Sequence, residues 1–221
     1  MNPIRDRFLA TLTSRIEDAG YPTHTLLDSA SEIVVFGSCA AGVDSAASDL
    51  DVMCFGEGPR IKTPALDLLW VPERLTTATD WLGSELATHV SKYGVPLRGR
   101  ALWRSSAWFS PEATTRKRRR IARLIEAASL GWENLHPVFH KRYQKTIRRE
   151  FQRYGCLLTQ AAVPPTPVLD REWLGLGASI LNLVACAELG EQTPFAMHLL
   201  SAGEDQLRDR PLVAGPPLRF L

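Results

Sequence analysis

Two short apolar runs, at residues 33–36 and 50–55, most constrain how this chain can fold. Continuous apolar runs of this length, bounded by turn residues, are typical of strands buried within a sheet. Two further strands are predicted at residues 65–71 and 95–97. We therefore expect a small mixed sheet to form the centre of the N-terminal part of the chain.

Helices are predicted between these strands from apolar residues at helical spacing. Ile4 and every fourth residue up to Ile16 form one apolar stripe, which predicts a first helix. A longer stripe begins after Pro72 and predicts one helix that ends at Gly94. The predicted fold class of this part is therefore α/β (α+β).

After residue 110 the pattern changes to helices without strands. Apolar spacing predicts four helices, at residues 116–130, 138–158, 173–189 and 195–200. A proline-rich stretch at residues 163–167 is predicted to be a loop. We therefore expect two domains, an α/β domain at residues 1–110 and an all-α domain with a basic surface at residues 111–221.

The charged residues are unevenly distributed between these halves. The 221 residues include 26 Lys or Arg and 24 Asp or Glu, for a net charge of +2, with 45% hydrophobic residues. This ordinary composition excludes a largely disordered chain and a disulfide-stapled mini-protein. Residues 98–153 carry an excess of +11, which leaves −9 for the rest. The asymmetry suggests an anionic partner that one half binds through metal and the other directly.

The sequence favours a cytoplasmic location and no membrane partner. No apolar stretch is long enough to cross a bilayer, and the mixed-charge start differs from a secretion signal. The four cysteines are scattered without the spacing of a zinc or redox pair. Scattered thiols fit a reducing cytosol.

Three carboxylates are predicted to converge on neighbouring strands. Asp49 and Asp51 stand two residues apart at the start of a strand, so their side chains leave it on the same face. Two carboxylates this close repel each other unless a cation intervenes, and oxygen-only ligands favour Mg²⁺ or Mn²⁺ over zinc. Asp67 lies within the next predicted strand. If the two strands are adjacent, all three carboxylates can hold two metal ions for phosphoryl or nucleotidyl transfer.

A glycine-serine turn precedes the acidic residues. Gly37 and Ser38 end the first buried strand, and ten residues separate Ser38 from Asp49. A glycine backbone can approach phosphate closely, and the turn offers amides and one hydroxyl. The order of this turn, Asp49-Leu50-Asp51 and the later Asp67 resembles the signature of the DNA polymerase β-like nucleotidyltransferase superfamily. The resemblance covers residues 30–100. The order of the predicted elements also resembles that of the minimal bacterial members of this superfamily.

The resemblance implies a chemistry for each of these positions. Asp49, Asp51 and Asp67 would be the catalytic and metal-binding residues, and Asp67 would also help to deprotonate the acceptor hydroxyl. Gly37 and Ser38 would bind a nucleoside triphosphate, with ATP favoured and Mg²⁺ or Mn²⁺ as cofactor. The implied activity is transfer of a nucleoside monophosphate to a hydroxyl of a protein, an RNA end or a small molecule, with release of pyrophosphate.

Two basic clusters, at residues 116–123 and 141–153, admit three interpretations. Cationic residues of a second domain often reach the triphosphate in this superfamily, and Lys141 and Lys145 are the candidates here. The clusters can instead bind the phosphates of RNA or DNA, or simply form solvated helix faces. The size of the basic surface favours an RNA or protein acceptor over a small drug.

A different class of function remains open. Gly37 and Gly42 have the spacing of a phosphate-binding P-loop, but Val43 and Asp44 stand where that motif requires Lys and Ser or Thr. The alternative to an enzyme is a catalytically silent nucleotide- or nucleic-acid-binding module, for example a regulatory or toxin-neutralising partner.

Overall fold

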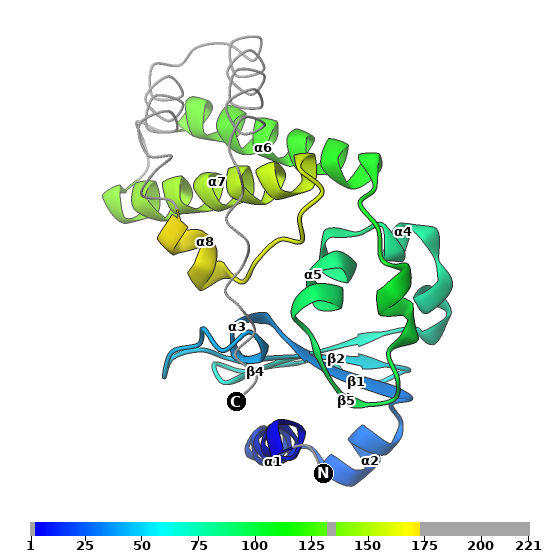
Figure 1. The fold of residues 1–221 in the computed structure, drawn as a ribbon. Helices are drawn as coiled ribbons and strands as arrows, with labels where there is room; N and C mark the ends of the chain where they lie inside the picture. Colours follow the sequence, from blue (N-terminus) through cyan, green and yellow to red (C-terminus); the bar gives the residue numbers. More distant parts are fainter. Residues whose placement is uncertain (1–2, 132–135, 173–221) are drawn as a thin grey trace. The chain divides into compact units, whose positions relative to one another are not determined.

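The computed structural model describes residues 3–131 and 136–172 (Figure 1). These residues divide into two compact units. The first comprises residues 3–108 with Pro164–Pro167, and the second comprises Phe109–Val163 with residues 168–172. The helices predicted at residues 173–189 and 195–200 lie outside the described residues.

The first unit is built on a five-stranded mixed sheet. Its strands are β1 (Glu32–Phe36), β2 (Leu50–Phe55), β3 (Ile61–Lys62), β4 (Leu66–Val71) and β5 (Val95–Arg98). They are ordered β3-β4-β2-β1-β5, with β2 and β4 parallel and the other neighbouring pairs antiparallel. The predicted mixed sheet is confirmed, and β3 is an element that the sequence did not predict.

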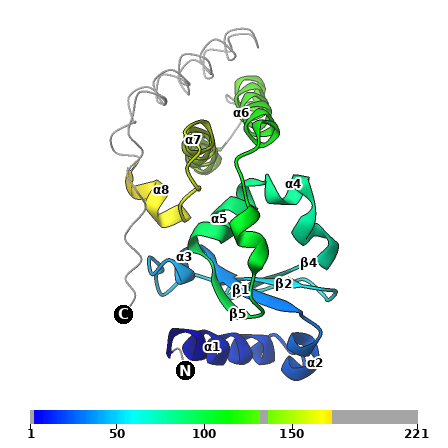
Figure 2. The same ribbon diagram turned by 45° about the vertical axis from the view of Figure 1, so that its right-hand side comes forward.

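Helices cover both faces of this sheet, as Figures 1 and 2 show. α1 (Pro3–Asp18) and α2 (Thr23–Asp28) lie on one face, and α4 (Thr79–Leu82) and α5 (Glu85–Tyr93) lie on the other. Three short elements complete the unit: α3 (Gly37–Ala40), η1 (Glu73–Thr77) and η2 (Leu102–Ser106).

Side chains of the sheet alternate between two hydrophobic cores, which is why the strands are continuous apolar runs in the sequence. In β1, Ile33 and Val35 join the core beneath α1, whereas Val34 and Phe36 join the core beneath α5. The helix α1 contributes the predicted stripe, of which Phe8, Leu12 and Ile16 are buried. The expected buried strands and first helix are therefore confirmed.

The prediction of one helix between Pro72 and Gly94 is wrong. The segment is divided into η1, α4 and α5. The reason is a local cap: the Ser84 hydroxyl accepts a hydrogen bond of 3.0 Å from the backbone amide of Ala87, so a new helix begins there. The apolar stripe is still used, because α4 and α5 pack on the same core.

The described residues of the second unit belong mainly to helices. α6 (Pro111–Gly131) and α7 (Pro137–Leu158) pack against each other, and α8 (Thr166–Glu172) follows. The start of α8 corrects the prediction that residues 163–167 form a loop throughout. Lys117 of α6 and Glu150 of α7 form a buried ion pair of 2.8 Å between the two helices.

The helices also bear on the question of a membrane span. Among the residues described by the structure, no helix combines the length and the apolar character needed to cross a bilayer.

Candidate metal centre

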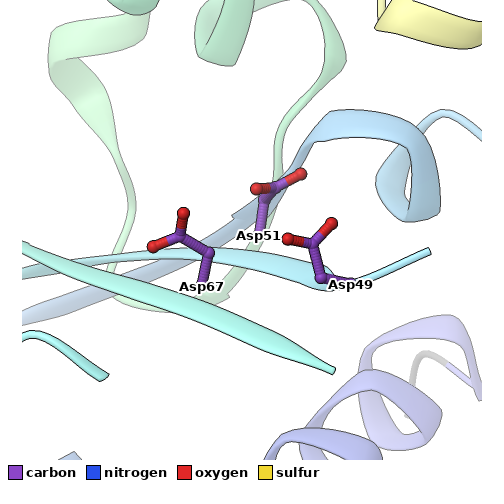
Figure 3. A group of neighbouring side chains, drawn as sticks. All are labelled: Asp49, Asp51 and Asp67. Atoms are coloured by element: carbon purple, nitrogen blue, oxygen red, sulfur yellow. The ribbon is translucent and has the colours of Figure 1, made fainter. Parts of the chain in front are cut away.

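The sheet brings the three predicted carboxylates to one face. Leu50 and Val52 of β2 point into the core beneath α1, so Asp51 between them points to the opposite face. Asp51 and Asp67 are direct partners in the parallel register of β2 and β4. Asp49 precedes Asp51 by two residues and therefore shares its face. Figure 3 shows all three carboxylates on the same side of the sheet.

The carboxylates are close enough to share a cation. One oxygen from each of Asp49, Asp51 and Asp67 lies within 4.8 Å of the others, and all three residues are partly buried. The Asp49 carbonyl accepts a 3.2 Å hydrogen bond from the Cys39 thiol, which connects this residue to α3. The predicted convergence of these three residues is therefore confirmed. The prediction required the strands of Asp51 and Asp67 to be adjacent, and β2 and β4 are paired.

The turn after β1 is shaped around Asp51. Gly37 has a φ of +72°, a region that side chains disfavour, and it lies beside Asp51 because Phe36 is the cross-strand partner of that residue. A Cβ on residue 37 would overlap the nearer Asp51 carboxylate oxygen and lie 3.0 Å from its Cγ. Ser38 follows within the first turn of α3 and is partly buried. That Gly37 and Ser38 bind a triphosphate stays a prediction.

The electrostatics of the site set Asp51 apart. Burial, reinforced by the nearby charges of Asp49 and Asp67, raises the pKa of Asp51 from 3.8 to about 7, against a lowering influence of Lys62. Without a cation, Asp51 therefore keeps its proton at mildly acidic pH, where an ordinary aspartate has already lost it. A divalent ion at the same place would relieve the same repulsion.

Two basic residues that sequence reasoning missed complete the site. Lys62 is the cross-strand partner of Asp67, and its ammonium group contacts one carboxylate oxygen. An Arg60 guanidinium nitrogen lies 3.2 Å from the other oxygen. Burial acts to raise the pKa of Asp67, but the hydrogen bonds and charges of Lys62 and Arg60 outweigh it and hold that pKa below its usual value.

The donor set fits a hard divalent cation. Three carboxylates offer oxygen only, which suits Mg²⁺ or Mn²⁺ rather than the softer metals that choose sulfur and nitrogen. Magnesium holds oxygens at about 2.1 Å, so its ligands lie roughly 3 to 4.2 Å apart. The oxygens of the three carboxylates all lie within 4.8 Å of one another, close to that range.

The other predicted nucleotide-binding residues belong to the second unit. Lys141 and Lys145 both lie on α7. The Lys145 ammonium is 3.5 Å from a carboxylate oxygen of Asp170, so it already has an anionic partner within its own unit. A role for either lysine at a triphosphate stays a prediction.

No family model matches the chain, and no curated protein matches it.

Proposed function

We propose that this chain is a metal-dependent nucleotidyltransferase with a polymerase β-like domain at residues 1–110. It transfers a nucleoside monophosphate from a nucleoside triphosphate, preferably ATP, to a hydroxyl acceptor and releases pyrophosphate. The observation that carries the proposal is the convergence of Asp49, Asp51 and Asp67 beside the Gly37 turn. Acidic residues are often clustered without a metal, but here a glycine with positive φ leaves room for one carboxylate against the turn.

The carboxylates would hold the cofactor. Bound Mg²⁺ or Mn²⁺ would neutralise charge on the triphosphate and on the attacking and leaving oxygens. Asp49 and Asp51 are the natural ligands of one ion, since Asp51 lies in β2 and Asp49 directly precedes that strand. Asp67 faces them from the adjacent strand and would complete a second site. Because these ligands belong to paired strands and their immediate flank, the site would be positioned before any ligand arrives.

The transfer itself needs few protein groups. The acceptor oxygen would form a bond to the α-phosphorus in line with the departing pyrophosphate, and the bond from that phosphorus to the bridging oxygen would break. The hydroxyl proton would pass to a carboxylate or to water. Asp67 is a weak base while Lys62 and Arg60 bond to it, because its pKa is lowered. Its predicted role in deprotonation therefore requires that this ion pairing first opens.

The first test removes the charge of the metal ligands. Labelled nucleoside triphosphates are incubated with a cell extract and the purified protein, and labelled protein, RNA and small molecules are then separated. We expect Asp49→Asn with Asp51→Asn to abolish metal-dependent labelling while the circular dichroism spectrum is retained. Asp6→Asn with Asp18→Asn is the matched control, because both residues are exposed on α1, across the sheet from the site. Undiminished labelling by the first variant would refute the mechanism.

One observation favours the silent binding module as a second candidate. Asp67 is already neutralised by two cations, which would suit a site that holds nucleotide without turnover. Binding of metal and triphosphate by the unmodified protein, with no labelled product for any of the four nucleotides, would support this second candidate over the enzyme.

For the acceptor, we propose an RNA strand bound along α6. Arg116, Arg119 and Arg123 are exposed at spacings that place them on one helix face, and none takes part in an ion pair among the described residues. The α7 cluster is more occupied: Lys145 and Arg149 both contact a single aspartate. The α6 face is therefore the better candidate for binding phosphates.

Salt dependence tests the acceptor proposal. Binding of single-stranded RNA should weaken as salt rises, and replacing the three α6 arginines by glutamine should lower the slope by about 0.7 for each phosphate that is no longer neutralised. The control replaces Arg5, Arg74 and Arg100, which are equally exposed but lie in the first unit. A flat salt dependence, or equal effects of the two triple variants, would refute RNA binding along α6 and favour a protein or small-molecule acceptor.

A further inference from the structure

The two cations at Asp67 are placed there by the register of the sheet. Ile61 of β3 is 2% exposed and belongs to the core beneath α1. Side chains alternate along a strand, so Arg60 and Lys62, on either side of Ile61, project to the opposite face. That is the face of Asp67, which pairs with Lys62 across the two strands. The contact of Arg60 and Lys62 with Asp67 therefore follows from the burial of Ile61 in the opposite core.

In these ion pairs the two cationic side chains are much more exposed to solvent than the carboxylate. The side chain of Asp67 is 15% exposed, whereas those of Lys62 and Arg60 are 60% and 65% exposed. Exposed cations on long side chains gain little net free energy from one fixed partner. Both groups can leave Asp67 at small cost, while Asp67 itself stays in place on β4.

The charge balance of the cluster indicates when Lys62 and Arg60 would leave Asp67. With all three carboxylates ionised, as metal ligands would be, the three carboxylates and two cations give the cluster a formal charge of −1. One divalent ion brings it to +1, and a second ion alone would bring it to +3 in a partly buried place. A polyanionic triphosphate removes that excess, and it also offers phosphate oxygens to the displaced ammonium and guanidinium groups.

We propose that Lys62 and Arg60 form a gate on Asp67 that makes entry of the second metal ion depend on the triphosphate. With no nucleotide, both cations hold Asp67, and a single ion binds to Asp49 and Asp51. When the triphosphate arrives with the second ion, Asp67 exchanges its two cations for that ion, and Lys62 and Arg60 turn to the phosphates. This inference rests on the proposed function, because it assumes that the triad holds metal.

Manganese binding tests the gate without any measurement of activity. Mn²⁺ alone is titrated into the full chain by calorimetry, and bound ions are counted by electron paramagnetic resonance. We expect one ion for the unmodified protein, and a second only when the non-hydrolysable analogue α,β-methylene-ATP is present. In Lys62→Met with Arg60→Gln, the second ion should bind without the analogue. Its affinity should be at least roughly tenfold higher than that of a second ion for the unmodified protein under the same conditions, since two nearby positive charges are gone. The same variant should bind the analogue several-fold more weakly.

The control and the outcomes separate the gate from the function. Lys92→Met with Arg5→Gln removes equal charge from exposed positions on α5 and α1, and should leave the stoichiometry at one ion. If the Lys62 and Arg60 variant also binds one ion with unchanged affinity, the gate is refuted and the metal site stands. If the unmodified protein binds two ions without the analogue, the gate is likewise refuted. If it binds none, with or without the analogue, both the proposed function and the gate fail.

Discussion

The Asp51 carboxylate fills the space in which a side chain on residue 37 would lie. Residue 37 also has a positive φ, so two independent constraints require glycine there. The relationship links a turn to a candidate metal ligand, because Asp51 can approach the turn this closely only when residue 37 has no side chain. A side chain at residue 37 should therefore disturb both the turn and the ligand.

Gly37→Ala should disturb the metal site more than its backbone strain explains. The positive φ costs about 1–2 kcal/mol for any L side chain, and the new methyl group must also displace Asp51. Gly42→Ala provides the matched control, since Gly42 has a φ of +66° and open space where its Cβ would lie. We expect similar losses of stability from strain in both variants, but at least tenfold weaker Mn²⁺ binding only in Gly37→Ala, measured by calorimetry. Equal Mn²⁺ affinities would contradict the link to Asp51.

Stability without metal should fall as the pH rises from about 4 to 7. The pKa of Asp51 is raised from 3.8 to about 7, so in this window the folded chain binds a proton that the unfolded chain has released. The folded state therefore loses stability with increasing pH, by on the order of 2 kcal/mol after allowing for partial exposure of the group. Asp67 acts in the opposite sense below about pH 4, because its pKa is lowered and its stabilising charge is lost on acidification.

Thermal melting in a metal chelator at several pH values measures this slope. Asp51→Asn should flatten it and raise the melting temperature at pH 8, whereas Asp18→Asn, at an exposed position on α1, should leave it unchanged. A slope that survives in Asp51→Asn would assign the proton to another group.

Removing one partner of the buried ion pair in the second unit should lower the free energy of unfolding more than removing both partners. The side chains of Lys117 and Glu150 are 9% and 4% exposed. Glu150→Gln removes the buried carboxylate that Lys117, Arg120 and Arg153 share and should cost about 3 kcal/mol in urea unfolding. Adding Lys117→Met should recover much of that loss. Asp170→Asn breaks a more exposed pair with Arg149 and should cost less than about 1 kcal/mol. Equal losses for the two single variants would argue against burial as the cause.

Much of the site was predictable because strands have a period of two. Residues 33–36 and 50–55 are apolar throughout since both faces of β1 and β2 are covered, and this marked them as central strands. The same period placed Asp49 and Asp51 on one face. The position of Asp67 then depended only on whether its strand lies beside β2, as it does.

The parts that escaped prediction depend on contacts between segments. A strand of two residues such as β3 has too little periodicity to be recognised, so the pairing of Lys62 with Asp67 had no local signal. The break before α5 depends on one hydroxyl, that of Ser84, whereas the apolar stripe runs on across it. Likewise, the partner of Lys145 is Asp170, a residue that only the packing of the second unit brings near.

The shortness of β3 has a consequence for how the site would open locally. β2 lies between two other strands and all its side chains except that of Asp51 are buried, so its amides should exchange with solvent only on extensive unfolding. β3 is a two-residue edge strand that can fray while the rest of the sheet stays intact. The cations that contact Asp67 thus lie at the edge of the sheet, whereas Asp51 lies on the inner strand β2. Fraying of that edge, visible as fast hydrogen exchange at residues 61–62, would free Asp67 without loosening Asp51.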